Sequence, residues 1–197
     1  MSKSKKNVID PEFIIQNYGA DAVRLFILSD SPPEKDVQWS EQGMVSSYKF
    51  IQKLWMIHNE IKNKLSKNDN KKVNIQLDKF TNQLIAKITN NLEKFNYNVI
   101  IANMYETYNF LSKEIDKSDI KDLKENYSKI LILMYPILPH LVSECIKDVQ
   151  KIDTVSWPVT QKEYLEEKYV NIVIQINGKK KSLIKIEKNL SEKALLE

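Results

Sequence analysis

The chain has 197 residues, of which 42% are hydrophobic and 28% charged, which is ordinary for a soluble protein of one or two domains with a buried core. The net charge of +4 attracts a polyanion only weakly, and Arg24 is the only arginine among 30 basic residues, so any RNA contact should be mostly with the backbone rather than with guanine edges. One cysteine, Cys145, and two distant histidines exclude an internal disulfide and a metal site, and the longest apolar run, Ile130–Tyr135, is too short to span a bilayer.

Residues 1–10 are expected to form a basic loop ahead of the first apolar pattern. Three lysines and two serines fall within the first six residues, and their ammonium groups, hydroxyls and backbone N–H groups all donate hydrogen bonds. This chemistry suits a polyanion, above all a triphosphate, and the alternative is a plain solvated basic arm. Asp10 and Pro11 then have the residue types of a helix N-cap and of the first helical position.

Two short helices and an irregular connector are expected next. Residues 11–18 should form the first helix, which Gly19 ends. Residues 21–29 should form a second helix that is apolar on nearly all sides and is therefore expected to be buried on most of them. Two prolines at the start of segment 31–40 stop this helix, and Trp39 should anchor the segment to a neighbouring element.

Four amphipathic helices follow, because apolar residues recur at helical spacing in four stretches. These helices are expected from 41 to about 65, from about 77 to 95, from about 98 to 115, and from about 118 to 149 with an interruption at Pro136 and Pro139. With no strand pattern among them, they predict an antiparallel bundle over residues 41–150.

Several polar and aromatic residues on these helices have two possible interpretations. The helix expected from 41 to about 65 carries Trp55 and His58 on its apolar stripe. We interpret His58 as a hydrogen-bonded core or groove residue rather than a catalytic one. Four tyrosines could stack on unpaired bases of an RNA. The favoured interpretation is that their rings lie in the core with only the hydroxyl near the surface. These tyrosines are Tyr97, Tyr105, Tyr108 and Tyr127.

The pattern changes after Trp157, where apolar residues alternate over 170–176 and indicate a strand. Asn177 and Gly178 predict a tight hairpin turn, residues 183–186 the return strand, and residues 189–196 a helix cap and the start of a helix. A hairpin with one stub of helix cannot bury a core alone, so we expect an incomplete α/β domain. The basic cluster Lys179, Lys180 and Lys181 follows the turn and could contact an RNA backbone, with plain solvation as the alternative.

Four stretches resemble a known family. Met1-Ser2-Lys3-Ser4, followed by Lys5-Lys6-Asn7-Val8-Ile9-Asp10-Pro11, resembles the Lys-Met-Ser-Lys-Ser loop of class I aminoacyl-tRNA synthetases, and Tyr18–Phe26 is similar to the helix pair that follows it. The first lysine of that motif would precede Met1, so we expect a fragment that starts inside the motif. Segment 31–40 is similar to the leucyl branch in particular, and Ile174–Lys179 is weakly similar to its C-terminal domain.

The resemblance implies a mainly α fold in three parts. These are a signature loop with stem-contact helices (1–40), an antiparallel helical bundle of the class I anticodon-binding type (41–155), and the start of a small α/β domain with a β-hairpin (168–197). The complete enzyme would activate leucine with ATP and Mg²⁺ and transfer it to tRNA(Leu), and the fragment would be inactive alone. It would be a cytoplasmic monomer without membrane contact.

Site residues also follow from the resemblance. Lys3 would be the catalytic lysine that contacts the ATP phosphates, and Ser2 and Ser4 would complete the ATP-binding loop. Lys179, Lys180 and Lys181 are the candidate tRNA contacts, and no residue is expected to bind a metal. Two alternatives remain open: a sister synthetase for isoleucine, valine or methionine, and a non-catalytic helical RNA-binding or scaffold protein.

Overall fold

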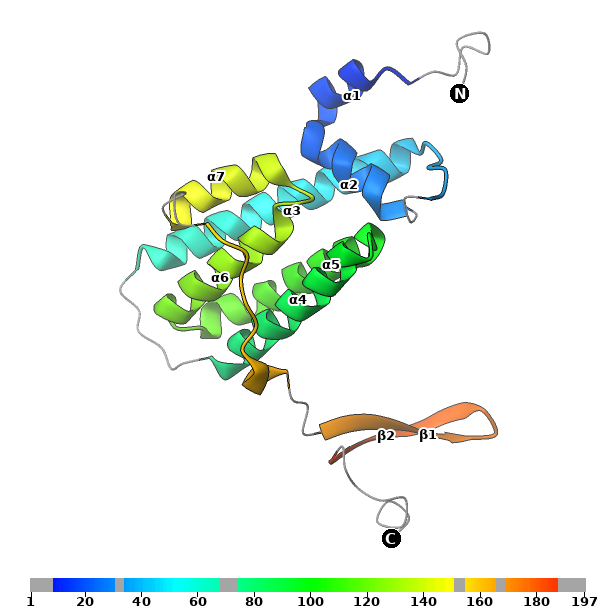
Figure 1. Cartoon of the computed structure of the whole chain (residues 1–197), viewed down its shortest axis with the longest axis vertical. Coiled ribbons are helices and arrows are strands. Elements are labelled where there is room, and N and C mark those ends of the chain that lie inside the picture. The colour runs from blue at the N-terminus through cyan, green and yellow to red at the C-terminus, as the bar shows by residue number, and fades with distance from the viewer. Residues whose placement is uncertain (1–8, 31–33, 68–73, 151–154, 166–168, 188–197) are drawn as a thin grey trace. The chain divides into compact units, whose positions relative to one another are not determined.

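A computed structural model describes residues 9–30, 34–67, 74–150, 155–165 and 169–187, and it divides into two compact units, 1–160 and 161–197. In the first unit the described residues form seven α-helices (Figure 1). Their bounds are α1 Pro11–Tyr18, α2 Ala20–Asp30, α3 Glu41–Leu65, α4 Ile75–Glu93, α5 Tyr97–Glu114, α6 Ile120–Met134 and α7 Pro139–Val149. The expected mainly α fold is confirmed.

The start of the helical part follows the expected capping chemistry. The Asp10 side chain accepts a hydrogen bond from the backbone N–H of Glu12 at 3.0 Å, and Pro11 occupies the first position of α1. Gly19 ends α1 with φ of 81°, and its N–H donates to the carbonyl of Ile15 at 2.8 Å. A side chain would strain this left-handed conformation, so glycine suits the one-residue corner between α1 and α2.

The main core lies between helices α2 to α7, and every one of them contributes fully buried apolar side chains to it. The fourth expected helix is in fact two helices, as the prolines required. Helix α6 ends at Met134, Pro136 lies in the turn, and Pro139 begins α7, where its missing N–H costs no hydrogen bond. The bundle therefore contains α2 as well as the helices expected for residues 41–150.

A smaller apolar cluster joins α1, α2, the connector and the start of α3. Trp39 contacts Phe26 edge to face, with ring centroids 5.3 Å apart, so the connector is anchored as expected. Ser40 caps α3 by accepting from the N–H of Gly43 at 3.1 Å. A Cβ atom on Gly43 would lie 2.8 Å from the Phe26 ring, so glycine permits this close approach of α2 to α3.

Of two expectations about burial, one is confirmed and one is wrong. Helix α2 is buried on most sides, as expected: among its residues 20–29, Arg24 and Ile27 alone are exposed, Ile27 at 47%, where α3, α5 and α7 leave the helix uncovered. Trp55 was placed on the buried stripe of α3 and is 43% exposed. It follows Leu54 by one residue, which turns it about 100° away from Leu54 around the helix.

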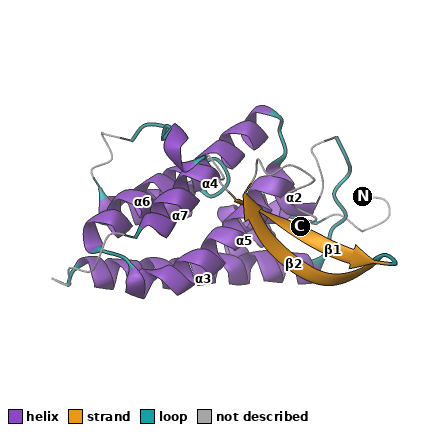
Figure 2. Ribbon diagram, turned by 90° about the horizontal axis from the view of Figure 1, so that it is seen from below, coloured by secondary structure: helices purple, strands orange, loops and turns teal. Residues whose placement is uncertain are grey.

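In the second unit, strands β1 Tyr169–Ile176 and β2 Lys179–Glu187 form an antiparallel hairpin (Figure 2). Asn177 and Gly178 both have positive φ, of 50° and 73°, which matches the primed turns that close two-residue hairpins. The expected hairpin is confirmed. The expected helix after it, residues 189–196, lies outside the described residues.

Candidate functional site

The residues expected to contact ATP precede the described part of the chain. Ser2, Lys3 and Ser4 all lie within residues 1–8, so their roles stay predictions. In the described part of the chain that follows, a groove of about 350 Å³ lies between α1 and the start of α3, lined by residues such as Ile9, Phe13 and Trp39. Its described charged residues are the two carboxylates Asp10 and Glu41, which would repel a phosphate.

The segment around α2 is joined to the bundle by a buried carboxylate. Asp21 is only 6% exposed, and it accepts three hydrogen bonds at the start of α7. The donors are the backbone N–H of His140 at 3.3 Å, its Nδ1 at 2.8 Å, and the backbone N–H of Leu141 at 2.7 Å. Asp21 thus satisfies the free N–H groups at the N-terminus of a helix more than a hundred residues later in the chain, where the helix dipole also favours a negative charge.

One turn later on α2, Arg24 binds the other side of the same corner. Its Nη2 donates to the carbonyl of Pro136 at 2.7 Å and its Nε to that of Ile137 at 3.0 Å. These carbonyls lie in the turn between α6 and α7. The only arginine of the chain is therefore engaged in a structural contact, and contacts with phosphates would rely on lysine. We call Asp21 and Arg24, with the α6–α7 corner, the junction.

Sequence reasoning missed the junction, although its signal was visible. Asp21 and Arg24 both belong to the stretch 18–26 that carries the family resemblance. Their spacing of three residues places both on one side of a helix, which is the only local hint that they act together.

A second polar network is buried within the bundle. His58 is fully buried; its Nε2 lies 3.1 Å from Asp148 and its Nδ1 3.0 Å from the hydroxyl of Tyr127. Hydrogen bonds from Lys62 and His58 lower the pKa of Asp148, so this carboxylate accepts from Nε2–H, and Nδ1 accepts from the Tyr127 hydroxyl. The expectation that His58 is a hydrogen-bonded core residue is confirmed.

The same region gives no sign of nucleophilic chemistry. Burial raises the pKa of Cys145 to about 12, so its thiol stays protonated near neutral pH. Burial also raises the pKa of Tyr127 well above its ordinary value. Among the described residues, no group of three or more histidine, cysteine, aspartate or glutamate side chains could hold a metal ion.

Replacing Tyr127 by Phe should lower the free energy of unfolding by about 1–3 kcal/mol, because it leaves the Nδ1 of buried His58 without a donor. Urea unfolding followed by circular dichroism measures this change. Tyr135→Phe is the matched control: Tyr135 is 49% exposed, so its loss of a hydroxyl should have little effect. Equal stability of Tyr127→Phe and the wild type would show that the bond contributes nothing.

The tyrosines mostly follow the core interpretation. Tyr127 is buried, and Tyr108 contacts Phe50 edge to face. Tyr105 is 41% exposed but stacks on Phe50, with ring centroids 3.8 Å apart. These rings are engaged within the bundle rather than presented to a base.

The predicted RNA-contacting lysines lie on the hairpin. Lys179, Lys180 and Lys181 are all exposed at the start of β2. Gln175 pairs with Lys180 and Ile174 pairs with Ser182, so Lys181 is an extra, bulged residue. A bulge bends the strand and changes the direction of its side chains. The cluster is accessible to a phosphate backbone, and its RNA contact stays a prediction.

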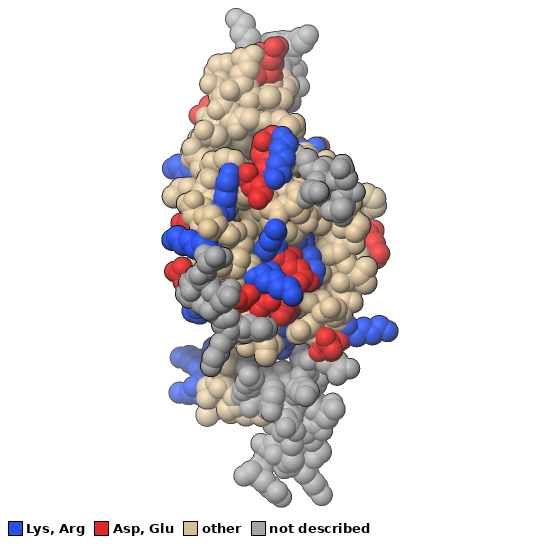
Figure 3. All heavy atoms as spheres, turned by 90° about the vertical axis from the view of Figure 1, so that its left-hand side faces the viewer, with Lys and Arg blue, Asp and Glu red and all other residues tan. Residues whose placement is uncertain are grey.

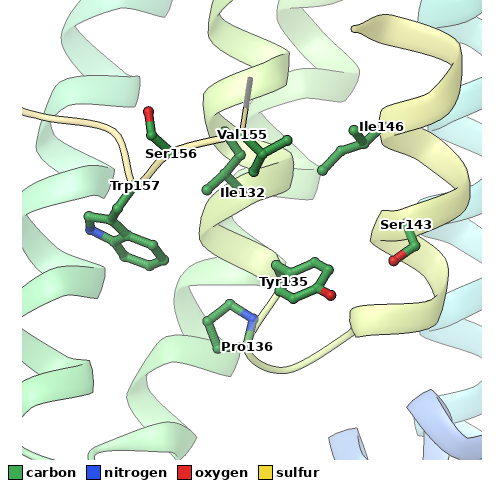
Figure 4. A pocket seen from close by; sticks show the side chains of 8 residues that line it. All are labelled: Ile132, Tyr135, Pro136, Ser143, Ile146, Val155, Ser156 and Trp157. Atoms are coloured by element: carbon green, nitrogen blue, oxygen red, sulfur yellow. The ribbon is translucent and has the colours of Figure 1, made fainter. Parts of the chain in front are cut away.

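The first unit offers further lysines, on α6. Figure 3 shows lysines interspersed with carboxylates over one face of the molecule, so this face has no uniform positive field. A groove of about 430 Å³ along α6 contains Lys121, Lys124 and Lys129, and Glu125 is the one carboxylate among its described lining residues. Beside it lies an apolar pocket of about 450 Å³ walled by Tyr135 and Trp157 (Figure 4).

The described helices include none with the length and apolarity needed to cross a bilayer.

Two protein families match separate parts of the chain. Residues 1–40 match tRNA synthetases class I (I, L, M and V), and residues 74–196 match the anticodon-binding domain of tRNA ligase.

Curated relatives over the whole chain are named leucine--tRNA ligase. The chain is 34% identical over 210 residues to that of Bartonella tribocorum (strain CIP 105476 / IBS 506), with 100% of this chain and 24% of that protein covered. It is 39% identical over 188 residues to that of Orientia tsutsugamushi (strain Boryong), with 93% and 22% covered. The chain thus spans about a quarter of the length of these relatives, and the resemblance to leucyl-tRNA synthetases is confirmed.

A solved structure shares the fold. The crystal structure of the ternary complex of Agrobacterium radiobacter K84 agnB2 LeuRS with tRNA and LeuAMS matches all of this chain and 26% of that chain, with a TM-score of 0.80 and 24% identity. The match to the anticodon-binding domain covers more than half of the 197 residues. The chain therefore belongs to the family of anticodon-binding domains of tRNA ligases.

Proposed function

We propose that this chain is the tRNA-binding C-terminal part of a leucine–tRNA ligase, which activates leucine with ATP and transfers it to tRNA(Leu). The observation that carries the proposal is the 34–39% identity to leucine--tRNA ligases over 93–100% of the chain. The relatives with this identity carry the name of the leucine enzyme, which favours it over the sister synthetases. We also propose that the ligase is a cytoplasmic monomer.

The division of labour follows from the two family matches. Residues 1–40 would supply the signature loop, with Lys3 contacting the phosphates of ATP and Ser2 and Ser4 shaping the loop. The bundle would bind the tRNA, and the junction of Asp21 and Arg24 would fix the loop segment relative to the bundle. Lys179, Lys180 and Lys181 would add contacts with the RNA backbone.

The described residues do not fit a bound Mg²⁺, because no group of carboxylates or histidines is placed to hold one. We therefore assign the metal no role in the described part of the chain. ATP and leucine are substrates whose binding groups, other than those of the loop, would lie outside these 197 residues.

The test is made on the purified chain. We expect it to retain a tRNA(Leu) transcript on a filter at low salt, and the logarithm of the binding constant should fall linearly with the logarithm of the salt concentration. We expect no leucine-dependent pyrophosphate exchange, because positioning of ATP and leucine supplies a large part of the rate. A failure to bind tRNA(Leu) at low salt would refute the tRNA-binding role, and measurable exchange would refute the assignment of catalysis to a longer protein.

A further inference from the structure

The apolar pocket beside α6 has the features of an aromatic binding site. Ile132 of α6 and Tyr135 directly after this helix form one wall, Ile146 of α7 another, and Val155 and Trp157 of the segment after α7 complete it (Figure 4). The Tyr135 and Trp157 side chains remain 49% and 38% exposed. Two large rings are thus accessible at the edge of a pocket of about 450 Å³, within the size range of small-molecule sites.

The orientation of Trp157 is fixed before any ligand binds. Its indole Nε1–H donates to the hydroxyl of Thr89 on α4 at 3.0 Å. This bond satisfies the only polar atom of the ring, and the ring itself forms part of the pocket wall. A ring held in place loses little rotamer freedom when a ligand stacks on it.

The basic groove on α6 is continuous with this pocket, because Ile132 and Ser156 line both. Glu125 is bound by Lys129 at 2.8 Å, and this contact lowers the pKa of Glu125. Among the described lining residues, the exposed side chains of Lys121 and Lys124, one helical turn apart, give an excess of positive charge. An apolar pocket is thus adjoined by two ammonium groups.

We propose that the Trp157 pocket binds one unstacked base of the RNA, while Lys121 and Lys124 bind the phosphates next to it. The inference deepens the proposed tRNA-binding function and depends on it. Single-stranded nucleic acids are bound by this combination of aromatic rings and adjacent cations. An apolar peptide or a lipid chain would use the pocket but would gain nothing from the two lysines.

The assignment is consistent with the rest of the molecule. Arg24 is engaged by the carbonyls of the α6–α7 corner, so phosphate contacts rely on lysine. Lysine binds a phosphate as a point charge and reads no base edge. Stacking is likewise tolerant of sequence, so the site would recognise an unpaired nucleotide rather than a particular base.

The test measures binding of the purified chain to a tRNA(Leu) transcript and to a fully paired RNA hairpin of similar length. Trp157→Ala should weaken binding of the transcript roughly 5- to 150-fold, the range typical of losing one stacked base. Trp157→Phe should retain most of the affinity, since it keeps a ring. Lys124→Ala should weaken binding of both RNAs. It should also reduce, by about one, the slope of the logarithm of the binding constant plotted against the logarithm of the salt concentration. The paired hairpin should be insensitive to Trp157→Ala.

Matched controls separate the site from general effects. Trp55→Ala removes another exposed tryptophan, on α3, and Lys113→Ala another exposed lysine, on α5; both should bind like the wild type. Tyr135→Ala, at an exposed position, should weaken binding without loss of folding, which covers the case in which Trp157→Ala unfolds. The proposal that this pocket binds a base would be refuted if Trp157→Phe, Tyr135→Ala and a folded Trp157→Ala all bound the transcript with wild-type affinity. The occupant of the pocket would then be an apolar segment. Failure of the unmodified chain to bind tRNA would instead refute both proposals.

Discussion

Replacing Asp21 by alanine is expected to lower the free energy of unfolding of the chain by roughly 2–3 kcal/mol, the cost of losing a buried charged acceptor. Three donors at the start of α7 depend on this carboxylate. In the variant the N–H groups of His140 and Leu141 lose their acceptor, and the favourable interaction with the helix dipole disappears. Urea unfolding at neutral pH measures the change.

The matched control is Asp119→Ala. Asp119 caps α6 from its own helix, by accepting from the N–H of Lys121 at 2.8 Å, and it is more exposed than Asp21. Loss of such a local cap typically costs about 1 kcal/mol. Asp21→Asn retains an uncharged acceptor and should lie between Asp21→Ala and the wild type. If Asp21→Ala lowered the free energy of unfolding no more than Asp119→Ala does, Asp21 would act as an ordinary helix cap and would not stabilise the contact between α2 and α7.

The junction matters because it determines what moves with the bundle. Asp21 and Arg24 hold one short helix to the α6–α7 corner by several hydrogen bonds at once. Residues 1–10 lead directly into α1, and Gly19 alone separates α1 from α2. A tRNA held by the bundle would therefore have a defined position relative to the start of α2, which is what a phosphate-contacting loop upstream of α1 would require.

Helix positions were predictable from the sequence, because the signals that set them are local. Apolar spacing placed the start of α3 at residue 41, where the structure shows Ser40 accepting from the N–H of Gly43. The two prolines located the break between α6 and α7. The turn at Asn177 and Gly178 needs positive φ at both residues, which these residue types tolerate best.

What escaped prediction depends on contacts between distant segments. Nothing near Asp21 in the sequence indicates that its partners are residues 140 and 141. The exposure of Ile27 depends on which sides of α2 the other helices cover, which apolar content alone does not specify. The pocket beside Trp157 forms only when the segment after α7 lies across α4 and α6.

Of the candidate RNA-binding residues, some were predictable from the local sequence and others depend on contacts between distant segments. The basic cluster on β2 was found from composition, but the bulge that leaves Lys181 unpaired depends on the register of the two strands. Lys121 and Lys124 were not singled out, because on the sequence they look like the solvated side of an amphipathic helix. Only the adjoining pocket gives these two lysines a distinct role.

The largest effect is expected from Lys3→Ala in a full-length leucine–tRNA ligase that contains residues 1–197. Leucine-dependent pyrophosphate exchange should slow on the order of 10²–10³-fold, the typical cost of losing one contact to charge that develops in the transition state. Negative charge builds on the departing pyrophosphate as the adenylate forms, so the Lys3 ammonium would stabilise the transition state more than bound ATP. The loss should therefore appear in kcat more than in the KM for ATP.

Lys5→Ala is the control for this experiment, because it removes the same charge two residues away. The family resemblance assigns the phosphate contact to Lys3, whereas Lys5 would contribute only long-range attraction, which salt screens. Its effect on exchange should be much smaller and should vanish as the salt concentration rises. Equally small effects of the two variants would mean that residues 1–6 act as a solvated basic arm, and that the lysine serving the phosphates lies elsewhere in the ligase.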